Sequence, residues 1–183
     1  MFFFSVSNLK LLKFLTVILI INTSLIEKTF SDDKNYKIEN IYKLLQDKEF
    51  EKSIEKLNML SKLNNIEAQL LYSKILLSGD ITPQNFEKSY FWASISLLGG
   101  VKKSKIVIEK LNKYLTDDQI KKIKEQIKIF LEKRAFAKDK RAIIQIAKLY
   151  EDFLDPPEFI NAYKWYNIAV AIGIKSAKNK RDD

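Results

Sequence analysis

Apolar residues recur along this chain three or four positions apart, the spacing of one face of an α-helix. The stretch Phe86–Leu98 shows this most clearly and is followed by a glycine pair. The chain holds only four glycines and three prolines, too few for the many tight turns of an all-β protein. The pattern therefore predicts an all-α fold, with helices over about 36–46, 49–63, 66–78, 86–98, 104–115, 117–131, 142–153 and 159–172.

A capping box marks the start of one of these helices. Thr116 is followed by two acidic residues, Asp117 and Asp118, and by Gln119 at the third position. The threonine and glutamine side chains can each accept from the other's backbone N–H, and the acids favour the positive end of the helix dipole. We therefore expect a long helix to begin directly after Thr116.

Parts of the chain repeat at a fixed spacing. The sequence Phe-Glu-Lys-Ser stands at 50–53 and again at 86–89, a spacing of 36, while Trp92 and Trp165 are 73 residues apart. The segment 142–153 also resembles 68–79 at a spacing of 74. The spacings of 73 and 74 are close to twice the spacing of 36. A period of about 36 residues is typical of a helical repeat array.

The repeat also predicts a shared turn. Fourteen residues after the phenylalanine that begins each of three helices stands a residue that tolerates left-handed backbone, namely Asn64, Gly100 and Gly173. Each helix is therefore expected to end in the same turn.

Packing is the expected role of both tryptophans. Small residues at Ser89, Ala93 and Ser96 would let a second helix approach closely, with Trp92 filling the space beside them. We expect Trp92 and Trp165 to be core residues in equivalent surroundings, and non-equivalent surroundings would contradict the scaffold interpretation that rests on the repeat.

These residues resemble a known family. The pattern of Ala68, Gly79, Trp92 and Gly100 is similar to that of a Sel-one-like repeat (SLR), a helical hairpin related to the TPR. The second copy departs from the family at Phe153, where the glycine that ends the first helix is expected. The helix after Thr116 is similar to one that often follows such repeats in exported bacterial proteins.

The resemblance covers about 48–179 and implies an architecture. It implies an α-solenoid of stacked antiparallel helix pairs, an SLR/TPR-like superhelix, over 36–183. The family implies an adaptor or scaffold in a protein complex, without catalysis. Because the chain ends where another helix would begin, a C-terminal truncation of the repeat domain is one interpretation.

Residues 1–31 carry a leader-like pattern. Lys10 and Lys13 precede an apolar run, and the 13 residues between Lys13 and Glu27 carry no charge. A membrane span needs about 20 residues, so the run favours a signal peptide, cleaved after Ser31 or, less favourably, after Ser24. The alternative is an uncleaved N-terminal anchor. Either predicts an exported body, periplasmic or extracellular, or held at the inner membrane, which the N-terminal segment would then contact.

No constellation of residues in the sequence supports catalysis. The chain has no cysteine and no histidine, which removes the commonest metal ligands and the commonest neutral-pH general base. The acidic pairs stand at predicted helix ends or at a terminus, where capping or solvation explains them. No glycine-rich phosphate loop is present. We therefore predict no enzyme activity, no cofactor and no metal site.

The formal net charge of +9 comes almost wholly from lysine, since arginine occurs only at 134, 141 and 181. Arginine is the residue that reads phosphates and bases bidentately, so we do not predict nucleic-acid binding. Two sets of residues are candidates for binding a protein partner. The first are side chains expected to point off the core of first helices, Gln69, Lys74, Gln145 and Lys148. The second lie on one face of the long helix, Lys121, Lys124 and Lys128.

The lysine face of the long helix has two interpretations: a solvated surface, or a docking patch for an acidic partner or an anionic membrane. The sequence thus predicts a non-enzymatic protein–protein interaction scaffold in the cell envelope, with an unidentified protein partner. The alternative is a structural envelope protein that docks on an anionic membrane surface or acidic partner through its lysine-rich face.

Overall fold

The computed structural model describes residues 37–182, and the predicted leader or anchor lies outside them. Two compact units divide the chain, residues 1–40 and 41–183. Only the start of one helix is described in the first unit, so the arrangement below is that of the second. The helices are α2 (Ile38–Gln46), α3 (Phe50–Lys62), α4 (Ile66–Ser78), α5 (Phe86–Leu98), α6 (Ser104–Leu111), α7 (Asp117–Phe136), α8 (Lys140–Lys148), the π-helical turn η2 (Leu149–Phe153), α9 (Phe159–Ala171) and α10 (Ala177–Asp182).

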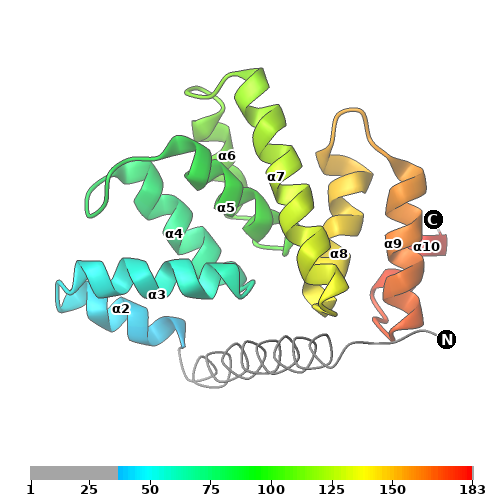
Figure 1. The fold of residues 1–183 in the computed structure, drawn as a ribbon, viewed down its shortest axis with the longest axis horizontal. Helices are drawn as coiled ribbons and strands as arrows, with labels where there is room; N and C mark the ends of the chain where they lie inside the picture. Colours follow the sequence, from blue (N-terminus) through cyan, green and yellow to red (C-terminus); the bar gives the residue numbers. More distant parts are fainter. Residues whose placement is uncertain (1–36, 183) are drawn as a thin grey trace, which may run out of the picture. The chain divides into compact units, whose positions relative to one another are not determined.

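The described part of the chain is all-helical, as predicted (Figure 1). The bounds of α4 and α5 coincide with the expected ones, while α6 ends at Leu111 rather than at about 115. The helix expected to reach Phe153 changes its hydrogen-bonding pattern after Lys148, and its last turn is the π-helical η2. The departure falls where the second copy lacks the family's glycine.

Local signals in the sequence begin several of these helices. The Thr116 hydroxyl accepts from the Gln119 N–H and the Gln119 side chain accepts from the Thr116 N–H, so the predicted capping box is confirmed. The side chains of Asn65, Asn85 and Asp139 cap α4, α5 and α8 in the same way. Each cap satisfies backbone donors that the first turn of a helix leaves unpaired.

The predicted shared turn is confirmed. Asn64, Gly100 and Gly173 all have left-handed backbone, with φ of 62°, 101° and 84°. In each turn the next residue donates its N–H to the carbonyl five positions earlier, which is the Schellman arrangement. Lys138, at the end of α7, adopts the same turn with φ of 64°, although lysine carries no sequence signal for it.

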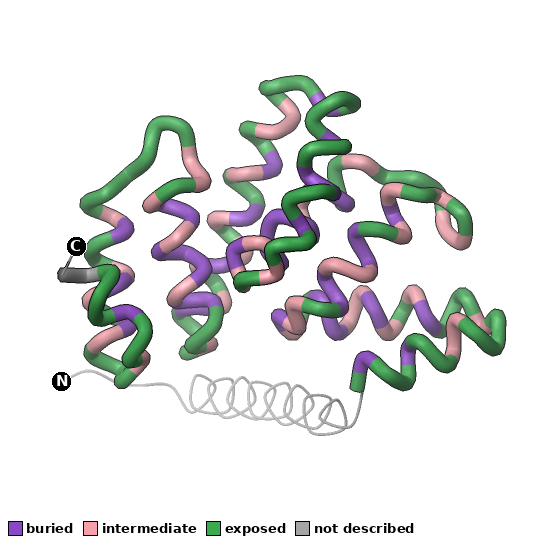
Figure 2. Tube along the Cα trace, turned by 180° about the vertical axis from the view of Figure 1, so that it is seen from behind, coloured by how far each residue is buried: buried purple, intermediate pink, exposed green. Residues whose placement is uncertain are grey.

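Two helical hairpins dominate the packing, α4 with α5 and α8 with α9. α3 packs on α4, and α7 packs on both α5 and α8. The small residues of α5 behave as predicted, since Ser89 and Ser96 are buried and their hydroxyls donate to the carbonyls of Ser73 and Ile66 in α4, at 2.7 and 2.6 Å. Figure 2 shows the resulting pattern, with buried positions on one side of most helices and exposed ones on the other.

The two tryptophans are not equivalent, contrary to expectation. Trp92 is 4% exposed and lies among the rings of Tyr72, Phe91 and Phe130. Trp165 is only half-buried, and its ring meets that of Phe136. The difference comes from the helices that pack against each tryptophan's helix. α5 has α4 on one side and α7 on the other, whereas α9 is followed, within the described residues, only by the short α10. The prediction that Trp165 is a core residue is wrong.

Candidate functional site: a cationic groove between α4 and α6

A hollow of about 810 Å³ opens between the C-terminal half of α4, the start of α5 and α6. α6 and the turn after it supply most of the lining, and α4 contributes Lys74, Leu77 and Ser78. Lys103, Ile106, Val107 and Lys110 follow one another at i, i+3, i+4 and i+7, so a single face of α6 lines the hollow.

Four lysines line this hollow and no acidic residue does: Lys74, Lys103, Lys110 and Lys113. None of the four has an ion-pair partner among residues 37–182. A concave surface lined by one sign of charge concentrates the electrostatic field and attracts the opposite charge. The hollow is therefore suited to an anionic ligand.

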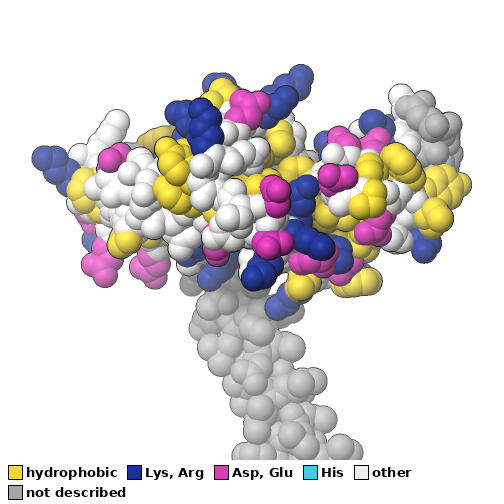
Figure 3. Space-filling model, turned by 90° about the horizontal axis from the view of Figure 1, so that it is seen from above, with side chains coloured by type: hydrophobic (Ala, Val, Ile, Leu, Met, Phe, Trp, Pro, Cys, Tyr) yellow, Lys and Arg dark blue, Asp and Glu magenta, His cyan; other side chains and the backbone are white. Residues whose placement is uncertain are grey.

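Apolar side chains lie between these lysines. The rings of Phe86 and Tyr114 are stacked with their centroids 4.6 Å apart. Ile106 and Tyr114 are nevertheless 58% and 60% exposed. Exposed apolar surface rimmed by charge is typical of interaction sites, and Figure 3 shows basic side chains beside hydrophobic ones on one face of the molecule.

A second hollow of about 610 Å³ continues the first and shares Lys74 and Lys103 with it. It adds Leu70, Lys102 and one acid, Glu67. Along α4 the two hollows are lined by residues of one helical face from Glu67 to Ser78. We call the joined surface the cationic groove, and its residues used below are Lys74, Lys102, Lys103, Ile106, Lys110, Lys113 and Tyr114, with Phe86.

The structure brings only one of the predicted partner-binding residues into the groove, Lys74. On α7, Lys121 is exposed, but the Lys124 ammonium lies over the Phe153 ring, 5.2 Å from its centroid. Lys128 pairs with Glu125 at 2.7 Å, and this hydrogen bond raises the pKa of Lys128. Lys148 is half-buried on α8. Since two of its three lysines are engaged within the chain, the α7 face does not present the free cluster that the sequence suggested.

Gln69 and Gln145 are fully buried, so the prediction that they point off the core is wrong. The Gln145 amide donates to the carbonyl of Ile95 at 2.9 Å and accepts from the Asn64 amide at 2.7 Å. Gln69 donates to the Asn64 amide oxygen at 3.1 Å and to the Ser61 carbonyl at 3.0 Å. Both amides therefore bind groups at helix ends within the chain and are not available to a partner protein.

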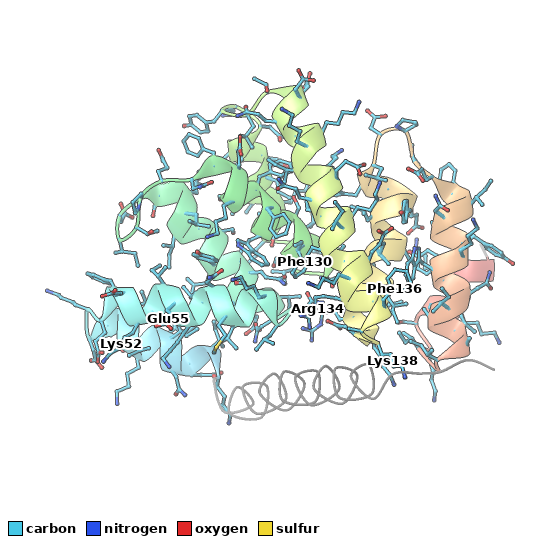
Figure 4. All side chains as sticks on the ribbon, viewed as in Figure 1. Lys52, Glu55, Phe130, Arg134, Phe136 and Lys138 are labelled. Atoms are coloured by element: carbon cyan, nitrogen blue, oxygen red, sulfur yellow. The ribbon has the colours of Figure 1, made fainter. Side chains whose placement is uncertain are left out.

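Two arginines extend this network to the surface. The Arg134 Nε of α7 donates to Asp139 at 2.7 Å, and its other nitrogens donate to the carbonyls of Lys62 and Leu63 at the end of α3. Figure 4 shows Arg134 between α7 and the end of α3. Arg141 donates to the Asn64 carbonyl. Two of the three arginines in the chain thus satisfy the free carbonyls of one helix end, a task that suits the planar guanidinium.

This arginine–amide clasp joins the α3–α4 turn to the α7–α8 turn, which are equivalent positions two periods apart. In a regular helical array each repeat contacts only its neighbours. The clasp joins units that are not neighbours, so the chain departs here from a regular array. The glutamines are buried because they lie inside this contact. Sequence reasoning missed it because the bonds that Gln145, Arg134 and Arg141 make to the earlier helices join residues 50 or more positions apart.

The clasp also makes stability depend on pH. Burial by itself would raise the pKa of the Asp139 carboxyl, but hydrogen bonds from Arg134, Asn64 and the Ala142 N–H outweigh it and hold the pKa below its usual value. A carboxyl whose pKa is lower in the folded state stabilises that state above the unfolded pKa, and this contribution is lost as pH falls through the folded pKa.

We therefore expect the free energy of unfolding to decrease as pH is lowered from about 5 to about 3, since an unfolded aspartate titrates near about 3.9. The variant Asp139→Asn should lose part of this pH dependence. Urea unfolding at a series of pH values measures both. Equal slopes for the variant and the unmodified protein would contradict a clasp role for the Asp139 carboxylate.

Among residues 37–182, no three acidic side chains come close enough together to hold a metal ion. In the same part of the chain, no helix combines the length and apolar character needed to cross a membrane. No family model, curated protein or solved structure matches the chain.

Proposed function

We propose that this chain is a non-enzymatic protein-interaction module, a helical array of SLR/TPR type that binds an acidic segment of a partner protein in the cationic groove. One observation carries the proposal: four lysines without ion-pair partners among the described residues surround an exposed apolar strip in a hollow formed by helix faces. In this proposal the protein acts as an adaptor in the cell envelope.

Carboxylates and an apolar side chain would have separate roles in such a ligand. Exposed ion pairs contribute only about 0.2–1 kcal/mol each, so the lysines mainly steer the ligand and set its register. Most of the binding free energy would come from covering Ile106 and Tyr114, at about 25 cal/mol per Å² of apolar surface. The expected partner segment therefore combines acids with at least one large apolar residue.

The solenoid part of the proposal is supported by the two packed hairpins and by the shared Schellman turn. The tryptophans and the clasp argue against a regular solenoid, because equivalent positions in different units have different surroundings. We therefore propose a short, irregular array rather than a uniform superhelix.

The alternative, docking on an anionic membrane surface through the α7 lysines, has less support. A bilayer is broad and flat, while four lysines without ion-pair partners among the described residues line a concave groove. Of the three α7 lysines predicted to dock, two have partners within the chain. Both proposals predict salt-sensitive binding, so they must be separated by the ligand used.

The first test uses the full chain and a fluorescent synthetic peptide that contains glutamates and one phenylalanine. We expect binding that weakens with salt, and the double variant Lys110→Glu/Lys113→Glu should weaken it about tenfold or more, which is about 1.4 kcal/mol. Tyr114→Ala should also weaken binding. Fluorescence anisotropy measures each affinity.

A matched control reverses two exposed lysines outside the groove, Lys121→Glu/Lys122→Glu on α7. If this control weakens peptide binding as much as the groove variant does, the groove is not the site. Co-sedimentation with phosphatidylglycerol vesicles tests the alternative, and vesicle binding that depends on Lys121 and Lys122 but not on Lys110 and Lys113 would favour it.

A further inference from the structure

A second exposed surface on the same chain carries the opposite charge. The end of η2 and the connection from η2 to α9 present three exposed acids, Asp152, Asp155 and Glu158. They are followed at once by Phe159 and Ile160, which are 67% and 75% exposed. We call these five residues the acidic patch. The three carboxylates are opposite in charge to the lysines of the cationic groove, and the two large apolar side chains match its exposed apolar strip.

Phe159 is more exposed than its counterparts in the repeat. Phe50 is 38% exposed, and Phe86, two periods before Phe159, is stacked on Tyr114 in the cationic groove. Phe159 has no ring contact among the described residues, although it stands three residues before the buried Ala162 on the same helix. The acidic patch therefore leaves more apolar surface uncovered than the equivalent positions at Phe50 and Phe86 do.

The two surfaces cannot meet within one chain. α6 lies on one side of α7, while the connection from η2 to α9 lies on the other, as both views show (Figures 1 and 2). α7 itself packs between α5 and α8. Contact between the groove and the patch therefore requires two molecules.

We propose that the acidic patch of one chain docks in the cationic groove of a second copy, head to tail. This rests on the proposed function of the groove, because the second copy would occupy the surface meant for a partner. Glu158 and Asp155 would face Lys110 and Lys113, and the apolar side chains of the patch would cover Ile106 and Tyr114. A contact between two different surfaces leaves a free groove and a free patch at the ends, so it can continue into chains.

Because its charges are exposed, such a contact should be weak and sensitive to salt. A partner segment with a better fit would displace the second copy, so self-association would keep the groove covered only until such a partner binds. The solution behaviour expected is therefore reversible association that rises with protein concentration and falls with added salt or acidic peptide.

Sedimentation velocity on the full chain, from about 1 µM to about 1 mM, tests this directly. We expect the weight-average sedimentation coefficient to rise with concentration at low salt. Both Lys110→Glu/Lys113→Glu and Asp155→Lys/Glu158→Lys should abolish the rise. The variant that carries all four substitutions should regain it, because the charges are then exchanged rather than lost. A fold damaged by mutation would not be rescued in this way.

Two outcomes would overturn the proposal. One is a chain that stays monomeric over the whole range at low salt, and the other is association that persists unchanged in Asp155→Lys/Glu158→Lys. Neither affects the proposed function, which is checked separately because Asp155→Lys/Glu158→Lys leaves the groove intact and should still bind the acidic peptide. If the unmodified protein did not bind the acidic peptide, the proposed function of the groove would instead be rejected. The α7 variant Lys121→Glu/Lys122→Glu should associate normally.

Discussion

Replacing Trp92 by alanine should lower the free energy of unfolding by about 3–5 kcal/mol, the usual cost of removing a large aromatic residue from a core. Trp92 is 4% exposed, and its ring lies 6.3 Å from that of Tyr72, 4.8 Å from Phe91 and 5.7 Å from Phe130, centroid to centroid. These rings come from α4, α5 and α7. The cavity would therefore loosen three helices at once.

The indole N–H of Trp92 has no hydrogen-bond partner among the described residues. The expected loss is therefore one of packing and not of a hydrogen bond. For the same reason Trp92→Phe, which keeps an aromatic ring and removes the unpaired donor, should cost much less than Trp92→Ala.

Urea unfolding followed by circular dichroism measures these free energies. Trp165→Ala is the matched control, and because Trp165 is only half-buried its cost should be clearly smaller. An unchanged unfolding midpoint for Trp92→Ala would show that the aromatic cluster does not hold the helices together.

Replacing Gln145 by leucine should lower the free energy of unfolding by about 2–4 kcal/mol. Leucine keeps nearly the same volume but removes the amide, which donates to the Ile95 carbonyl and accepts from the Asn64 amide. A buried polar group that loses its partner costs about 1–3 kcal/mol, and here two groups are affected. Each group retains one partner, since the Ile95 carbonyl still accepts from the Gly99 N–H at 2.9 Å and Asn64 still contacts Asp139 at 3.1 Å. This keeps the estimate below the full sum.

The matched control for this prediction is Gln126→Leu, an exposed glutamine on α7. It should change stability by less than about 0.5 kcal/mol, as surface substitutions usually do. If Gln145→Leu proves neutral or stabilising, the buried amide network contributes no net stability, and apolar packing alone joins the α3–α4 turn to the α7–α8 turn.

The groove illustrates how far side-chain type alone can mislead about a site. Lys121, Lys124 and Lys128 share a helix face in sequence, yet two of them are engaged by Phe153 and Glu125. Lys110 and Lys113 have no such partner within residues 37–182, and they line the same hollow only because α6 packs beside α4. Their charge could be counted from the sequence, but their concave arrangement could not.

Local physics in the sequence determined the helices, their caps and the turns after them. The capping box at Thr116 and the left-handed residues Asn64, Gly100 and Gly173 depend on interactions a few residues apart, which any reader of the chain can recognise. Only the tertiary structure decided which side chains are buried, because burial depends on segments far apart along the chain. It covered Trp92 but not Trp165, turned Gln145 inward toward Asn64, and left Lys110 facing an open groove.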